Sequence, residues 1–132
     1  MIYSLDTNVI VRSLRGKNAD GIAAKLATLT PDEVKVPEMV RAELLTGAAK
    51  SDRPDHHREV VEQFLAPFER LAFGGDSPEH YADIRSRLER AGETIGPNDL
   101  VIAATTRSAG AVLVTANLDE FSRVPGLICE DW

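Results

Sequence analysis

The 132-residue sequence lacks the features that mark several large classes of protein. Its single cysteine, Cys129, cannot form a disulfide within the chain or build a thiolate zinc site, so a reducing cytoplasm is the expected compartment. No run approaches the roughly 20 apolar residues that cross a bilayer, and no basic and then apolar leader precedes Asp6. Repeats, low-complexity tracts and Gly/Ser linkers are also missing. We therefore expect one soluble domain over residues 1–132, with no membrane partner.

Basic residues are in the minority. The chain has 15 Lys and Arg against 21 Asp and Glu, and its formal net charge is −6. Domains that hold DNA by bulk charge usually carry a basic face, so we do not expect this chain to bind DNA directly. An acidic chain can still act on phosphates through a metal ion held by carboxylates. The apolar fraction of 43% is enough for a folded core.

Short apolar stretches alternate with helical patterns along the chain. The expected strands are 2–5, 34–36 and 111–115, with weaker patterns at 68–73 and 127–129. The expected helices are 9–14, 19–29, 39–49, one around 60–65, 77–91 and 97–108. This alternation predicts an α/β fold with a parallel sheet between helical layers.

Functional sites in parallel sheets form beyond the carboxyl ends of the strands. Asp6 directly follows the first expected strand, and Asn117 and Asp119 follow the last long one. Asp6 also has a plainer interpretation as a helix N-cap, because Asp-Thr-Asn is good capping chemistry. Both interpretations stay open at this point.

Two further acids lie in expected helices. Glu43 shares a helix face with apolar or small residues, where an unpaired charge is costly if buried. The alternative is a rotated helix that leaves Glu43 in solvent. Asp99 lies in the first turn of an apolar helix, so it either faces a cleft or is a favourable first-turn acid behind an Asn98 cap.

Taken together, Asp6, Glu43 and Asp99 predict a cation site. None has an obvious basic partner close in the sequence, and like charges gathered in a cleft repel one another unless a cation lies among them. Hard oxygen ligands select Mg²⁺ or Mn²⁺. A carboxylate-held Mg²⁺ is a common device for cutting phosphodiesters.

Five segments occur in a characteristic order and spacing: Asp6–Asn8, Arg41–Leu44, Gly96–Ala104, Leu113–Asn117 and Glu120–Leu127. The first three resemble the PIN-domain ribonucleases. The last two are similar to the VapC toxins of type II toxin–antitoxin pairs. The resemblance covers essentially the whole chain, including its length.

This resemblance implies a three-layer α/β/α PIN-like fold with a central, mainly parallel sheet. It also implies a cytoplasmic, metal-dependent endoribonuclease that cleaves structured RNA such as tRNA or rRNA. The implied cofactor is Mg²⁺, for which Mn²⁺ can substitute. The implied partners are the RNA substrate, a cognate antitoxin protein that silences the enzyme, and a second copy in a homodimer.

Carried over residue by residue, the resemblance makes Asp6, Glu43, Asp99 and Asn117 the catalytic group. Asp6 and Asp99 become the primary metal ligands, with Glu43 and Asp119 as further candidates. The PIN pattern often has a fourth acid where this chain has Asn117. One and two metal ions therefore both remain open.

Supporting roles follow for three more residues. Thr115 is expected to hydrogen-bond a neighbouring carboxylate. Arg12 and Arg85 are candidate contacts for RNA phosphates, and the alternative is that these arginines pair with acids on a solvated face. A different class of function, a catalytically inactive PIN-like module that binds RNA or protein, also remains. The complete set of three acids favours the enzyme.

Overall fold

The computed structural model describes residues 1–16 and 19–132. Within them, five strands form one sheet in the order β3-β2-β1-β4-β5. Their bounds are β1 Tyr3–Leu5, β2 Val34–Pro37, β3 Glu69–Leu71, β4 Val112–Val114 and β5 Cys129–Glu130. Every pair of neighbours is parallel, which confirms the α/β prediction.

The first strand lies in the middle of this sheet. Tyr3 is paired with Val34 on one side and with Val112 on the other. The ladder continues one residue past the strand, where the Asp6 N–H donates to the Val114 carbonyl at 2.9 Å. Residue 6 therefore lies beside the end of β4, although more than 100 positions separate the two segments in the chain.

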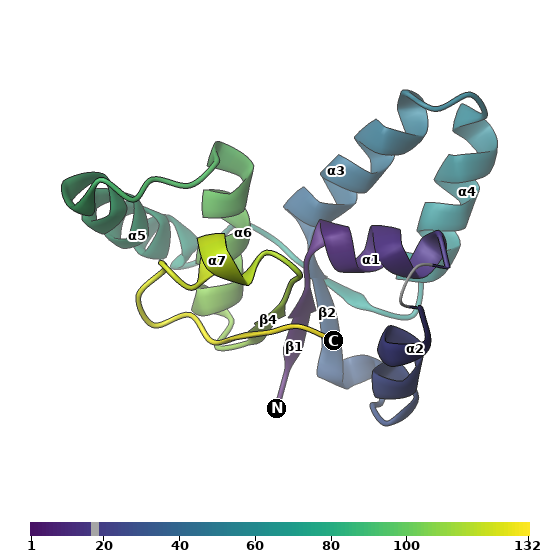
Figure 1. Cartoon of the computed structure of the whole chain (residues 1–132), viewed down its shortest axis with the longest axis horizontal. Helices are drawn as coiled ribbons and strands as arrows, with labels where there is room; N and C mark the ends of the chain where they lie inside the picture. The colour runs from purple at the N-terminus through teal and green to yellow at the C-terminus, as the bar shows by residue number, and fades with distance from the viewer. Residues whose placement is uncertain (17–18) are drawn as a thin grey trace.

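Helices cover both faces of the sheet (Figure 1). Their bounds are α1 Thr7–Leu14, α2 Ala19–Ala27, α3 Glu38–Ala49, α4 Pro54–Leu65, α5 Ser77–Ala91, α6 Pro97–Ser108 and α7 Leu118–Phe121, with a 3-10 turn η1 at Pro31–Glu33. Figure 1 shows α5 and α6 on one side and α1 and α2 on the other. The α3–α4 hairpin extends beyond the carboxyl edge of the sheet. The predicted three-layer arrangement is thus confirmed.

Details of three segments differ from the sequence-based expectation. Helix α6 begins at Pro97, as predicted, but its N-cap is Gly96, so the alternative in which Asn98 caps this helix is wrong. Proline suits the first helical position because its φ is already fixed and its missing N–H has no partner to lose there. The one-turn helix α7 was not expected. The last strand starts at Cys129, two residues later than predicted.

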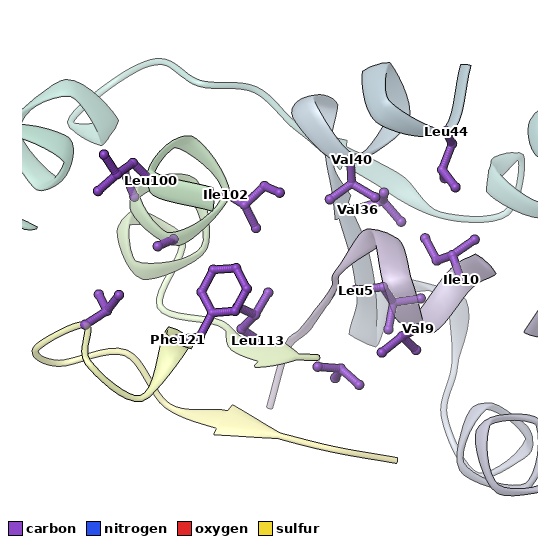
Figure 2. Packing of buried hydrophobic residues seen from close by; sticks show 14 of the residues in the cluster. Leu5, Val9, Ile10, Val36, Val40, Leu44, Leu100, Ile102, Leu113 and Phe121 are labelled. Atoms are coloured by element: carbon purple, nitrogen blue, oxygen red, sulfur yellow. The ribbon is translucent and has the colours of Figure 1, made fainter. Parts of the chain in front are cut away.

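Buried apolar side chains join the two helical layers through the sheet (Figure 2). On the α6 side, Figure 2 shows Leu100, Ile102, Leu113 and Phe121. On the α1 side it shows Leu5, Val9 and Ile10. All seven are at most 6% exposed, and each such side chain contributes about 1.5–3 kcal/mol when fully buried.

One buried polar pair fixes α6 on the sheet. The hydroxyls of Ser4 in β1 and Thr106 in α6 lie 2.9 Å apart, and both residues are fully buried. Because an unpaired buried hydroxyl is costly, this bond favours one position of α6 along β1. That position sets where the first turn of α6, and with it Asp99, meets the end of β1.

Candidate metal-binding active site

Four acidic residues meet at the carboxyl edge of the sheet, and we call them the acid cluster: Asp6, Glu43, Asp99 and Glu120. Asp6 follows β1, Glu43 lies in α3, Asp99 is in the first turn of α6 and Glu120 is in α7. Charge interactions connect them, because the charges of Asp6, Glu43 and Glu120 all act on Asp99. The cluster therefore brings together the three acids that the sequence singled out and a fourth that it did not.

Asp6 is both a helix cap and a member of the cluster, so the two interpretations of this residue are compatible. Its Oδ1 accepts the Thr7 N–H at 2.8 Å and caps α1. Its Oδ2 accepts the Asn8 side-chain amide at 3.1 Å and the Thr115 hydroxyl at 2.7 Å. The Thr115 bond confirms the prediction that this residue hydrogen-bonds a carboxylate.

Burial raises the pKa of Asp6, which is 3% exposed. The hydrogen bonds from Thr115, Thr7 and Asn8 oppose this rise, and the charge of Glu43 adds to it. The net direction is upward because neutral donors do not fully replace the water that a buried carboxylate has lost. Asp6 is thus an acid whose negative charge is oriented but not neutralised.

Glu43 is partly buried and is held at both of its oxygens. Its Oε1 accepts the Thr7 hydroxyl at 2.7 Å, and its Oε2 accepts the Asn98 side-chain amide at 3.4 Å. These bonds link α3 to the starts of α1 and α6. The alternative in which α3 turns Glu43 into solvent is therefore not what the structure has.

Asp99 and Glu120 share a hydrogen bond between their carboxyl groups. Burial, this bond and the surrounding negative charge raise the pKa of Asp99 to about 7. Burial opposes ionisation of Glu120 as well, but bonds from the Gly96 N–H, the Asn117 amide and Asp99 lower its pKa. The pair therefore keeps one proton, on Asp99, until the pH approaches about 7.

Glu120 is the functional candidate that sequence reasoning missed. Its Oε1 accepts the Gly96 N–H at 3.1 Å, and its Oε2 accepts the Asn117 side-chain amide at 2.6 Å. Asp119, which the sequence favoured, is exposed, and no recorded contact joins it to the cluster. Residues three apart on a helix share a face. The spacing of Asn117 and Glu120 therefore indicates that their side chains meet, but only when the helix α7 is already known.

The two candidate phosphate contacts are already paired. Arg12 forms an ion pair with Asp131 at 3.0 Å. Arg85 pairs with Glu89 at 2.7 Å and donates to the Tyr81 hydroxyl at 3.0 Å. This matches the alternative in which the arginines pair on the surface, and neither contacts the acid cluster.

The donor set of the cluster fits a hard divalent cation. In residues 1–16 and 19–132, none of the recorded ion pairs involves Asp6, Glu43 or Asp99. Burial raises the pKa of the Cys129 thiol to about 11, so a soft thiolate is not offered at neutral pH. Oxygen donors with unneutralised charge favour Mg²⁺ or Mn²⁺.

The acids do not form a closed cage as they stand. Over the described part of the chain, no three Asp, Glu, His or Cys side chains surround a common point closely enough to hold an ion. A Mg²⁺ site does not need such a cage, because this ion usually keeps several waters and takes only one or two carboxylates. Two carboxylates of the cluster would be enough for such a site.

A groove of about 300 Å³ opens beside the cluster. Thr7 and Glu43 belong to its lining, and most of the rest is aliphatic, including Leu14, Leu44 and Val60. The groove is therefore a mainly apolar surface beside Glu43 of the acid cluster.

In the described residues, no helix is both long enough and apolar enough to cross a membrane.

Comparisons with known proteins agree with this geometry. The PIN domain family matches residues 3–127. Ribonuclease VapC2 of Rickettsia felis is 36% identical over 133 residues, covering 100% of this chain and 98% of that protein. The tRNA(fMet)-specific endonuclease VapC of Shigella flexneri is 34% identical over 130 residues, covering 98% and 97% respectively.

Solved structures give the same result. A DNA-bound VapBC complex from Salmonella typhimurium contains a chain that matches with a TM-score of 0.94 at 34% identity, covering 100% of this chain and 98% of that one. A chain of VapBC2 from Rickettsia felis, bound to a promoter DNA fragment, matches with a TM-score of 0.89 at 33% identity, covering 100% and 99%. The chain with this acid cluster belongs to the PIN domain family and, within it, to the VapC ribonucleases.

Proposed function

We propose that this chain is the toxin of a toxin–antitoxin pair, a Mg²⁺-dependent endoribonuclease whose active site is the acid cluster. The observation that carries the proposal is the meeting of Asp6, Glu43 and Asp99 at one sheet edge without a recorded cationic partner. The VapC relatives, two of them named as a ribonuclease and a tRNA(fMet)-specific endonuclease, support the same reaction class.

Asp6 and Asp99 are the proposed metal ligands. When bound, a divalent cation supplies stabilisation of the charge that develops on a scissile phosphate and promotes ionisation of the attacking water. Glu43, fixed by Thr7 and Asn98, is placed to orient that water or to accept its proton. Mn²⁺ is expected to substitute for Mg²⁺, since both prefer oxygen ligands.

Asn117 and Glu120 take the place of the fourth acid of the PIN pattern. Asn117 donates its amide to Glu120, and Glu120 contacts Asp99. We propose that Glu120, rather than Asp119, supplies the fourth carboxylate. Asn117 then orients Glu120 and does not bind metal itself.

Structured RNA is the proposed substrate, and tRNA is the first to test because one relative is named for it. The proposed partners are a cognate antitoxin and a second copy of this chain. The groove beside Glu43 suits an apolar antitoxin segment, which would cover the acids. We assign DNA contacts to that antitoxin, since this chain has a net charge of −6, and we place the pair in the cytoplasm.

RNA cleavage by the purified protein tests the function. We expect bulk tRNA to be cut at discrete positions with Mg²⁺ or Mn²⁺ and to stay intact with EDTA. Asp6→Asn and Asp99→Asn should each lower the cleavage rate by more than about 100-fold, beyond the effect typical of residues that only support a ligand.

Asp6→Asn is expected to fold, because asparagine caps a helix about as well as aspartate. Asp99→Asn is expected to fold because it keeps the shape of the side chain and removes one of the charges that repel each other in the cluster. Asp55→Asn, an exposed acid in the first turn of α4, is the matched control and should cut at the wild-type rate. Cleavage that persists in EDTA, or wild-type cleavage by either site variant, would contradict the assignment. The catalytically inactive module predicts no cleavage under any of these conditions.

A further inference from the structure

The side chain of Asn8 bridges the two segments that carry most of the acid cluster. Its Nδ2 donates to Asp6 Oδ2 at 3.1 Å. Its Oδ1 accepts the Ala116 backbone N–H at 3.0 Å. The chemistry allows only this orientation, because the flipped amide would place its oxygen against a carboxylate and its NH₂ against an N–H donor.

The segment to which Asn8 is hydrogen-bonded, which begins at Ala116, continues to the other side of the cluster. After Ala116, the Asn117 N–H donates to the Thr115 hydroxyl at 3.0 Å, and the Asn117 amide donates to Glu120 at 2.6 Å. Glu120 in turn contacts Asp99. A continuous set of hydrogen bonds thus runs from Asp6 through Asn8 and residues 115–117 to the Asp99–Glu120 pair.

The fold itself does not require asparagine at this position. Asn8 is the second residue of α1, and the cap of that helix is already supplied by Asp6. Asparagine is a poor helix former because its side chain competes for backbone groups. Here both polar ends of that side chain are used, one on a site carboxylate and one on the loop that follows β4.

We propose that Asn8 is a positioning residue for metal binding. It holds the Asp6 carboxylate and the Ala116–Asn117 backbone in one arrangement, so that the acids from the two sides of the cluster face the same ion. The proposal rests on the proposed function, since it concerns how that site is set. Asn8 acts through Asp6 and the Ala116–Asn117 backbone and does not bind the ion.

The test uses Asn8→Ala, with Ser13→Ala as the matched control. Ser13 lies on the same helix, is also partly buried, and its side chain makes no hydrogen bond to another residue that the structure describes. Mn²⁺ binding to the full-length protein without RNA is measured by isothermal titration calorimetry. Asn8→Ala should raise the Kd for Mn²⁺ about tenfold, the range seen when a ligand loses its supporting bond. Ser13→Ala should leave it within twofold of wild type.

Two measurements separate positioning from a general loss of structure. In the metal-free protein, hydrogen exchange of the Ala116 amide should accelerate in Asn8→Ala, while the amides of β4 stay protected. In an Asp6→Ala background, adding Asn8→Ala should weaken Mn²⁺ binding by clearly less than it does in the wild type, because one of the two groups that Asn8 holds is gone. RNA cleavage should fall in kcat with KM nearly unchanged.

The outcomes are distinct. If the wild-type protein and Asn8→Ala bind Mn²⁺ equally well, the proposed role of Asn8 is wrong and the proposed function is unaffected. A full tenfold effect that persists in the Asp6→Ala background also overturns that role. Wild type that neither binds Mn²⁺ nor cuts RNA overturns both proposals.

Discussion

At the scale of single residues, the acids of the cluster are held by neutral donors and not by cations. Backbone N–H groups, hydroxyls and side-chain amides contact Asp6, Glu43 and Glu120. Such donors orient a carboxylate without cancelling its charge, whereas a lysine or arginine would do both. The negative potential therefore remains for a cation to neutralise.

Replacing the two neighbouring acids of α7 one at a time tests which of them belongs to the site. Glu120→Gln should lower the cleavage rate at least about tenfold, because it weakens the contact with Asp99 and removes a charge from the cluster. Asp119→Asn, one residue away and exposed, should leave the rate unchanged. Cleavage assays on tRNA with Mg²⁺ measure both, and the reverse order of effects would restore Asp119 as the fourth acid.

The pKa of Asp99 predicts a pH dependence of stability in the metal-free protein. The unfolded chain releases this proton near pH 3.8, whereas the folded chain keeps it up to about pH 7. The free energy of unfolding should therefore fall as the pH rises from about 4 to 7 and then level off. Glu120, whose pKa is lowered, contributes the opposite slope only below about pH 4.5.

Urea unfolding at several pH values in EDTA measures this slope, and Asp99→Asn should reduce it, leaving the slope of the same sign that the raised pKa of Asp6 contributes. Mn²⁺ affinity should change in the opposite direction, since the ion displaces the proton. We expect its Kd to decrease by up to about tenfold per pH unit between pH 5 and 7. A Kd that is independent of pH would show that Asp99 does not bind the ion.

At the scale of elements, α7 is the weakest support of the site. Its four residues are too few to form a stable helix alone. Phe121 is fully buried in the core, and it anchors the helix that presents Glu120. The position of α7, and with it that of Glu120, therefore depends largely on one aromatic side chain.

Truncating that anchor should affect both stability and activity. Phe121→Ala is expected to cost about 3–5 kcal/mol in free energy of unfolding, because it removes a large buried side chain and leaves a cavity. Leu118→Ala, on the same helix with 39% exposure, should cost less than about 1 kcal/mol. Urea unfolding followed by circular dichroism measures the difference, and equal costs would contradict an anchoring role for Phe121.

The same elements show what can be predicted from sequence and what cannot. Strands such as Val112–Val114 and helices such as Pro97–Ser108 carry strong local patterns, and both were predicted within a few residues. Helix α7 has no periodicity to detect over four residues, and Glu120 was missed with it. Hydrogen bonds between distant segments, such as Thr7 to Glu43, depend on tertiary placement that no local pattern contains.

The order of strands was also beyond local pattern. Alternation predicted a parallel sheet, but the central place of β1 follows from its pairing with both β2 and β4. The convergence of Asp6 and Asp99 was predictable, because strand ends and first helical turns meet at the carboxyl edge. The contacts that orient those acids could not be predicted from the sequence, with the exception of the hydrogen bond from Thr115 to Asp6.

At the scale of the whole molecule, metal binding and stability are linked. A cation that binds only the folded state stabilises it by about 2.7 kcal/mol at 100 times its Kd. For a chain of this size, that corresponds to a Tm increase of roughly 5–10 °C. Thermal scans with Mn²⁺ and with EDTA should show this difference, and the doubly substituted Asp6→Asn, Asp99→Asn protein should show none.

The central position of β1 also has a consequence in time. A ribosome adds about 5–20 residues per second, so roughly 5–20 s separate synthesis of Asp6 from that of Thr115, 109 positions later. Until β4 has been made, β1 lacks the neighbour on one side, and the Asp6 carboxylate lacks its Thr115 donor. The growing chain therefore carries an incomplete acid cluster until β4 and α7 have been synthesised, and we expect it to gain the capacity to cut RNA only after that point.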